Sequence, residues 1–241
     1  MLVRRIFGTC RPQFKLRAPA QSPAISRHYS RSPHDEAEGL IYPDSPSKNH
    51  WDLPSFLSYA DRAGLDRAST VYKGTLFEYT VGASLARYGF YLRRVGGASD
   101  AGIDLLGTWT LPRPRSAPRA TLRVLVQCKF EKKKPGPRHI RELEGSFAGA
   151  PAGWAGDGVV GFMVSRMEAT KGMREALGRS SRPMGYLACG EGGEVRQMLW
   201  NGRAEEEGLG GLGVVVRRFE DGRAGELVLT MNGAPVPLIE G

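Results

Sequence analysis

The sequence has few cysteines and no long apolar run. Its 241 residues contain three cysteines, which form neither the close pairs that bind zinc nor a disulfide framework. No apolar run reaches about 18 residues, the length of a membrane-spanning helix, so the sequence predicts no membrane span. The sequence also lacks a Walker motif and the GxGxxG motif of dinucleotide sites. Its chemistry must therefore come from other side chains.

Acidic residues are absent from residues 1–34, which contain seven Lys and Arg residues. The formal net charge of the chain is +9, and this segment supplies most of it. The rest of the chain is nearly balanced, so its global charge does not by itself indicate a nucleic-acid partner. An Arg- and Ser-rich segment without acids, and without the apolar stretch of a secretory signal, is typical of a transit peptide.

A short tract near the end of this segment supports the same interpretation. Arg27-His28-Tyr29-Ser30 resembles the Arg-x-Tyr-Ser context at which mitochondrial processing peptidases cut. We therefore expect residues 1–34 to be a removable, disordered transit peptide and the protein to reside in the mitochondrial matrix. The alternative is a disordered basic tail that binds acidic surfaces.

Hydrophobic periodicity predicts an α/β fold behind this segment. Residues 35–70 are expected to form a linker with a short helix at 53–62, residues 71–190 the core, and residues 191–241 a C-terminal extension that completes it. The expected core elements are a helix at 71–89, strands at 90–95, 103–109 and 122–130, a helix at 138–147, a strand at 158–165, a helix at 167–178 and a strand at 184–188. A helix at 193–207 and β-segments at 212–219 and 226–231 follow. This order predicts a mixed β-sheet flanked by helices.

Four polar residues of the expected core stand where they could meet. The strand period puts Gln127 and Lys129 on the same side of their strand, with Cys128 opposite. Asp104 begins the preceding strand, after the loop at 97–102, so pairing of the two strands would bring these three residues together. Glu78 lies at the edge of the apolar face of the leading helix. Carboxylate, amide and carbonyl oxygens form the kind of site that suits Mg²⁺.

These residues give the chain a resemblance to a known group of nucleases. Glu78 in the leading helix, Gly102-Ile103-Asp104 in the second strand and Gln127-Cys128-Lys129 in the third resemble the PD-(D/E)xK superfamily, specifically its Mrr-type restriction endonuclease branch. That branch commonly has Gln where other members have Asp or Glu. With the presequence and the tract Leu199-Trp200-Asn201, the chain also resembles the fungal mitochondrial family named as required for respiratory growth, member seven.

The resemblance implies a restriction endonuclease-like core and a role for each site residue. Asp104 would be the main ligand of Mg²⁺ or Mn²⁺, and Glu78 and Gln127 would be further ligands. Lys129 would stabilise the attacking hydroxide and the charge that builds on the phosphate. The implied activity is that of an endodeoxyribonuclease, with DNA as substrate. RNA as a substrate and a homodimer are left open.

A basic cluster follows Lys129 and adds a candidate phosphate-binding surface. It consists of Lys132, Lys133, Lys134, Arg138 and Arg141, with Arg113, Arg115 and Arg119 as further contributors from a proline-bearing loop. Beside a nuclease site such a cluster would bind phosphates in a salt-dependent way; alternatively it is a solvated surface. Two other functions stay open, namely a catalytically weak or inactive nucleic-acid-binding or assembly factor, and an RNA-processing nuclease.

Overall fold

A six-stranded mixed sheet forms the centre of the computed structural model, which describes residues 40–96, 102–111, 121–218 and 225–239. The strands lie side by side in chain order. Their bounds are β1 (Phe90–Arg94), β2 (Leu105–Thr110), β3 (Thr121–Lys129), β4 (Val159–Ser165), β5 (Met184–Cys189) and β6 (Val195–Trp200). β3, β4 and β5 run parallel, whereas β1, β2 and β6 pair antiparallel to their neighbours. The predicted mixed sheet is confirmed.

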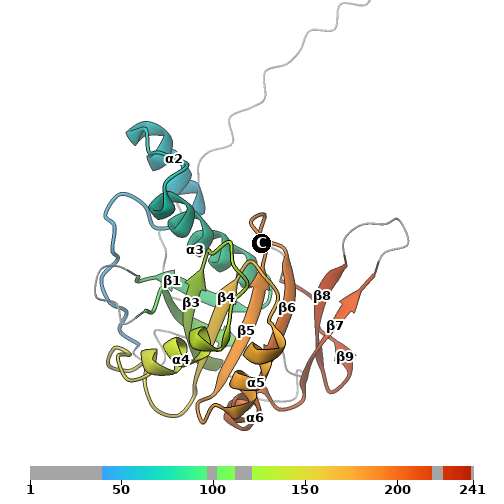
Figure 1. The fold of residues 1–241 in the computed structure, drawn as a ribbon. Helices are drawn as coiled ribbons and strands as arrows, with labels where there is room; N and C mark the ends of the chain where they lie inside the picture. The colour runs from blue at the N-terminus through green and yellow to red at the C-terminus, as the bar shows by residue number, and fades with distance from the viewer. Residues whose placement is uncertain (1–39, 97–101, 112–120, 219–224, 240–241) are drawn as a thin grey trace, which may run out of the picture. The chain divides into compact units, whose positions relative to one another are not determined.

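Helices cover both faces of this sheet (Figure 1). The helices are α2 (Leu53–Ala63), α3 (Thr70–Ala86), α4 (Pro137–Ser146), α5 (Lys171–Arg179) and α6 (Gly202–Ala204), the last continuing into η1 (Glu205–Leu209). Phe77, Val81 and Leu85 of α3 pack into the core on one face, while α4 and α5 pack on the other. β4 and β5 are buried along their whole length, as expected for parallel strands covered on both faces. None of the helices within the described ranges has the length and apolar character needed to cross a bilayer.

Sequence determines where the helices begin and how closely β1 and β2 approach. The Ser69 hydroxyl accepts a hydrogen bond from the backbone N–H of Tyr72 and so caps α3, and Thr170 caps α5 in the same way. A Cβ atom at Gly107 of β2 would lie 1.8 Å from the carbonyl oxygen of Tyr91 in β1. Only glycine therefore permits this strand pair, which holds β1 against the site described below.

A second sheet follows the first and packs against the same core as α3. It contains β7 (Leu212–Arg217), β8 (Glu226–Met231) and β9 (Ala234–Pro235). Leu227 and Leu229 of β8 enter the core on the α3 side. The Tyr88 hydroxyl donates to the carbonyl of Leu227, and the backbone N–H of Ile239 donates to the carbonyl of Arg87. These bonds attach the C-terminal residues to the end of α3.

Asn201 joins three elements on the other side of the sheet. Its amide oxygen accepts from the backbone N–H groups of Met184 and Ala204, at 3.1 and 3.0 Å. Its amide nitrogen donates to the carbonyls of Leu177 and Arg182, at 3.1 and 2.8 Å. This buried side chain links the end of α5 to the start of β5 and caps α6.

Most predicted elements agree with the structure, but one predicted helix is wrong and another begins later than predicted. The predicted helix at 193–207 is instead the strand β6 followed by α6 and η1. Val195 and Met198 are buried there, because β6 pairs with β5 and completes the sheet. The predicted helix at 167–178 begins later, since Thr170 is its cap and residues 167–169 lie outside it. The transit-peptide prediction for residues 1–34 falls outside the described residues.

Candidate active site

Asp104 is held between β1 and β3, at the point where β2 begins. Its carbonyl oxygen accepts hydrogen bonds from the backbone N–H groups of Val95 and Gly96, and its own N–H donates to the carbonyl of Val126. Its carboxylate accepts from the backbone N–H of Cys128, at 2.6 Å. Because Cys128 stands between Gln127 and Lys129, the structure brings the Asp104 carboxylate to the strand segment that the sequence predicted.

Glu78 lies on α3 and faces the same hollow as Asp104. A cavity of about 340 Å³ is lined by both carboxylates together with Arg94 and backbone of Gly96. Glu78 forms an ion pair with Arg94 of β1, and the two side chains are only 13% and 14% exposed. The Glu78 carboxylate is therefore bound to a cation supplied by the chain itself.

Gln127 is buried on the α4 side of the sheet. Its side chain lies beside Gly102, where a Cβ atom would be 2.7 Å from the Gln127 amide nitrogen. The amide oxygen is buried and has no hydrogen-bond partner among the described residues. A buried carbonyl oxygen without a partner is costly, so this atom is suited to accept a bond from a cation or a water molecule.

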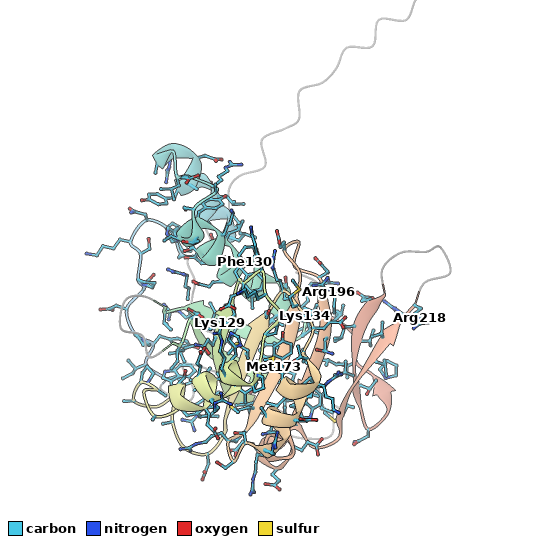
Figure 2. All side chains as sticks on the ribbon, viewed as in Figure 1. Lys129, Phe130, Lys134, Met173, Arg196 and Arg218 are labelled. Atoms are coloured by element: carbon cyan, nitrogen blue, oxygen red, sulfur yellow. The ribbon has the colours of Figure 1, made fainter. Side chains whose placement is uncertain are left out.

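Lys129 ends β3 and is partly exposed. Its ammonium lies 3.5 Å from the carboxylate of Glu142 on α4, and the two side chains are 29% and 45% exposed. Figure 2 shows Lys129 at the end of β3, where the chain leaves the sheet toward Phe130. An ion pair this exposed is weak, so Lys129 can exchange its partner for a phosphate.

The four predicted residues gather around the end of β3 but in two subsets. Glu78 and Asp104 line one cavity on the α3 side, whereas Gln127 and Lys129 contact Gly102 and Glu142. The pKa of Cys128 reflects the negative charges of the first subset. Burial raises the pKa of its thiol, and the negative charges of Asp104 and Glu78 raise it further. A thiol in this environment is protonated and is no nucleophile.

The predicted basic cluster is exposed. Lys132, Lys133 and Lys134 lie in the loop after β3, and Arg138 and Arg141 lie on the outer side of α4. Arg138 lies 3.6 Å from the carboxylate of Glu131, so part of its charge is compensated. Residues 97–101 of the predicted loop and the basic residues Arg113, Arg115 and Arg119 fall outside the described residues.

Arg94 and Glu142 are site residues that the sequence analysis missed. Each forms an ion pair with one of the four predicted residues, Arg94 with Glu78 and Glu142 with Lys129. The available signal for Arg94 was its place at the end of β1, opposite the start of β2. Sequence shows no partner for Glu142, because its contact depends on how α4 crosses the end of β3.

The residues present fit a divalent cation in part. Asp104 and Gln127, whose amide oxygen has no partner among the described residues, carry oxygens of the kind that Mg²⁺ prefers as ligands. Glu78 is paired with Arg94, and no group of three His, Cys, Asp or Glu side chains suited to a metal occurs within the described ranges. A cation here would depend on few protein ligands and several waters, which is the usual mode for Mg²⁺.

Comparison with known proteins assigns the chain to a family. Residues 69–121 and 115–216 match the family described as Required for respiratory growth protein 7. The chain belongs to this family. A mitochondrial protein of Schizosaccharomyces pombe is 32% identical over 169 residues, which are 69% of this chain and 65% of that protein. The mitochondrial Required for respiratory growth protein 7 of Saccharomyces cerevisiae is 28% identical over 172 residues, 56% of this chain and 71% of that protein.

These relatives confirm the family and the compartment predicted from the sequence. Both are named as mitochondrial, and we place this chain in mitochondria as a member of a family required for respiratory growth. The chain spans 65% of the length of the fission yeast relative. Among solved structures, the MspJI restriction endonuclease in complex with a 27-mer oligonucleotide aligns over 61% of this chain and 32% of that chain, with 16% identity and a TM-score of 0.33. A likeness this distant carries no argument about the site.

Proposed function

We propose that this protein carries a nuclease-type domain that hydrolyses DNA phosphodiesters with the help of Mg²⁺ or Mn²⁺ and thereby supports mitochondrial genome maintenance and respiratory growth. The observation that supports this best is the hydrogen bond from the Cys128 backbone to the Asp104 carboxylate. It brings a carboxylate to a strand end that also carries a buried amide oxygen and a lysine. A carboxylate can hold a cation and an ammonium can stabilise charge on a phosphate, and both assist phosphodiester hydrolysis.

Each residue has a role that its surroundings support. Asp104 would hold the cation, which would supply charge neutralisation at the phosphate and a lowered pKa of water. The Gln127 amide oxygen, which lies in the other subset, would contribute through a water molecule. Lys129 would leave Glu142 and donate to the phosphate oxygens, where an ammonium stabilises the growing negative charge. Glu78 keeps Arg94 in place beside this centre and would bind metal only after that ion pair opens.

A second candidate function keeps the binding and omits the hydrolysis. The observation that favours it is the ion pair between Glu78 and Arg94, which neutralises one of the two carboxylates of the cavity. Gln127 in place of a carboxylate removes a further negative charge, so the site attracts a cation weakly. Such a protein would act in mitochondria as a nucleic-acid-binding or assembly factor.

One experiment separates these functions. The purified chain is incubated with plasmid DNA, with linear duplex DNA and with single-stranded RNA, each in Mg²⁺, in Mn²⁺ and in EDTA. The proposed function predicts cleavage of DNA that requires the cation and is lost in Asp104→Asn and in Lys129→Ala. The matched controls are Asp44→Asn and Lys171→Ala, two exposed residues outside the site.

The other outcomes of this experiment distinguish the alternative functions. Binding of DNA without cleavage under every cation condition would favour the binding factor and overturn the nuclease proposal. Cleavage confined to RNA would favour the RNA-processing nuclease. Because many nucleases that cut both strands act as dimers, the oligomeric state is measured by light scattering with and without DNA, which tests the homodimer left open by the sequence.

A further inference from the structure

A second hollow lies against the other side of α3. Its volume is about 360 Å³, within the range of small-ligand sites. Lys73, Leu76, Phe77 and Thr80 of α3 form one wall, whereas Thr70, Gly74 and Glu78 of the same helix line the cavity of the candidate active site. The opposite wall comes from Phe130 and the loop after β3. The two hollows therefore share a helix and lie close to the end of β3.

Positive charge dominates the lining of this hollow. Arg67, Lys73, Lys132 and Arg166 line it, against one acidic residue, Glu191. Arg166 is paired with Glu191, and Arg67 with Asp61 at 2.5 Å. Lys73 and Lys132 form no ion pair with any residue that the structure describes, and both are exposed. The Lys73 ammonium donates one hydrogen bond to the carbonyl of Ala68, at 2.8 Å, so both ammonium groups keep an uncompensated charge and further donors for an anion that enters the hollow.

Aromatic surface lies beside these charges. Phe130 is half-buried at the end of β3, its ring centroid 5.4 Å from that of Phe77. The guanidinium of Arg166 lies over the Phe130 ring, 5.0 Å from its centroid, and its Nε donates to the carbonyl of Glu131. These contacts fix the orientation of the ring. Phe130 follows the candidate phosphate-binding lysine, Lys129, directly in the chain, and Figure 2 shows both near the end of β3.

We propose that this hollow binds an unpaired nucleotide, with its base against Phe130 and Arg166 and its phosphate on Lys73 and Lys132. Proteins that bind single strands combine aromatic rings, on which bases stack, with cations that follow the backbone. A paired base is stacked inside its duplex and cannot enter such a hollow. The inference rests on the proposed action on nucleic acid and deepens it, because it names a single-stranded segment beside the scissile site as the part that is bound.

The test measures binding without cleavage. The full chain is titrated into a fluorescent oligothymidylate and into a duplex of the same length, in EDTA, and the anisotropy gives each Kd. Phe130→Leu keeps an apolar side chain and removes the ring. It should weaken single-strand binding by about tenfold, the effect of losing one base stack, and change duplex binding little. Lys132→Ala should lower the slope of log K against log salt by about 0.7, the effect of losing one phosphate contact on a single strand.

Controls and competing ligands decide what the result means. Lys171→Ala removes an exposed lysine outside the hollow and should leave single-strand affinity unchanged. Competition by AMP would show that the hollow also binds a free nucleotide. Failure of AMP to compete would mean that the hollow binds a nucleotide only within a single strand. Because Lys132 is exposed, its variant remains informative even if Phe130→Leu fails to fold.

The inference and the proposed function can fail separately. Single-strand affinity equal to that of the unchanged chain in both Phe130→Leu and Lys132→Ala would overturn the inference, whether or not the protein cleaves DNA. An equal loss for single strand and duplex in Phe130→Leu would also overturn it. Absence of cleavage together with the expected loss of single-strand binding would leave the inference standing and remove only the hydrolysis.

Discussion

The carboxylate of Asp104 accepts a hydrogen bond from the backbone N–H of Cys128, 2.6 Å away. This bond lies just beyond the last regular pair of β2 and β3, Leu105 with Val126. A side chain here replaces the backbone partner that a longer β2 would have given to Cys128. Asp104 therefore stabilises the contact between β2 and β3 and is also part of the candidate site. Different substitutions distinguish its structural role from its role in cleavage.

Asp104→Asn and Asp104→Ala should differ in stability but not in activity. Asn keeps an oxygen that can accept from Cys128, whereas Ala leaves that N–H without a partner, at a cost of about 1–3 kcal/mol. Both variants lose the charge that would hold a cation, so both should lose cleavage while DNA binding survives. Urea unfolding and plasmid cleavage measure the two effects, and cleavage at the original rate in Asp104→Asn would refute the assignment.

The ion pair of Lys129 with Glu142 allows the role of the ammonium in cleavage to be distinguished from the role of the pair itself. Lys129→Ala should abolish cleavage, because it removes the ammonium that would donate to the phosphate. Glu142→Gln should retain cleavage, since it only releases Lys129 from a partner. As this pair is partly exposed, each change should alter the free energy of unfolding by less than about 1 kcal/mol. Loss of cleavage in Glu142→Gln as complete as in Lys129→Ala would contradict a role specific to the ammonium.

The pair of Glu78 with Arg94 should behave as a buried ion pair. Arg94→Met leaves the Glu78 carboxylate without its cation at 13% exposure, which costs about 3–5 kcal/mol. The double variant Glu78→Gln with Arg94→Met should recover part of that loss, because no uncompensated charge remains. Mg²⁺ should stabilise Arg94→Met more than it stabilises the original chain, since a carboxylate that is no longer paired with Arg94 gains affinity for a cation. Thermal unfolding with and without Mg²⁺ checks this, and equal stabilisation would count against a metal at this cavity.

Gly102 and Gly153 form a matched pair for testing the position of Gln127. Both have positive φ angles, +79° and +85°, so alanine strains the backbone at either. Only at Gly102 would the new Cβ lie 2.7 Å from the Gln127 amide nitrogen, whereas nothing lies within 4 Å at Gly153. Gly102→Ala should therefore be the more destabilising, by about 1–3 kcal/mol as for other overpacked sites, and should also lower cleavage. Equal effects in both variants would mean that Gln127 moves aside freely.

His50 should make the free energy of unfolding depend on pH. It lies in the segment before α2 and contacts α3. It is buried, its Nδ1 lies 2.7 Å from the Tyr79 hydroxyl, and burial followed by the charge of Arg94 lowers its pKa from 6.5. Above pH 6.5 the ring is neutral in both states, so its contribution is fully present there. As the pH falls through the lowered pKa, the unfolded chain takes up the proton more readily and that stability is lost. Urea midpoints above and below pH 6.5 should show the loss in the original chain and a smaller one in His50→Gln.

The sequence predicted the parts of the fold that local patterns encode. The apolar face of α3 has the helical period and β4 is a continuous apolar run, and the structure confirms this helix and this strand as well as the predicted strand β5. The sequence predicts a helix over 193–207, whereas the pairing of residues 195–200 with β5 makes them a strand. Such pairing joins residues distant in sequence, so tertiary contacts override the local preference.

The candidate site was predictable only in its outline. The positions of Asp104, Gln127 and Lys129 follow from strand order and period, and the structure places all three around the end of β3. Their partners were not predictable, because Arg94 and Glu142 arrive from other elements. The division between the α3 side and the α4 side also depends on how helices cross the sheet, which no residue spacing specifies.

The bonds from the last described residues to the end of α3 bear on how the protein can be shortened. The Tyr88 hydroxyl and the Arg87 carbonyl both bond to groups beyond residue 225, and β6 covers the outer edge of β5. A fragment that stopped at residue 190 would expose that strand edge and the apolar end of the helix that carries Glu78. Such a fragment would aggregate through its open edge, so a minimal soluble piece must retain the chain through residue 239.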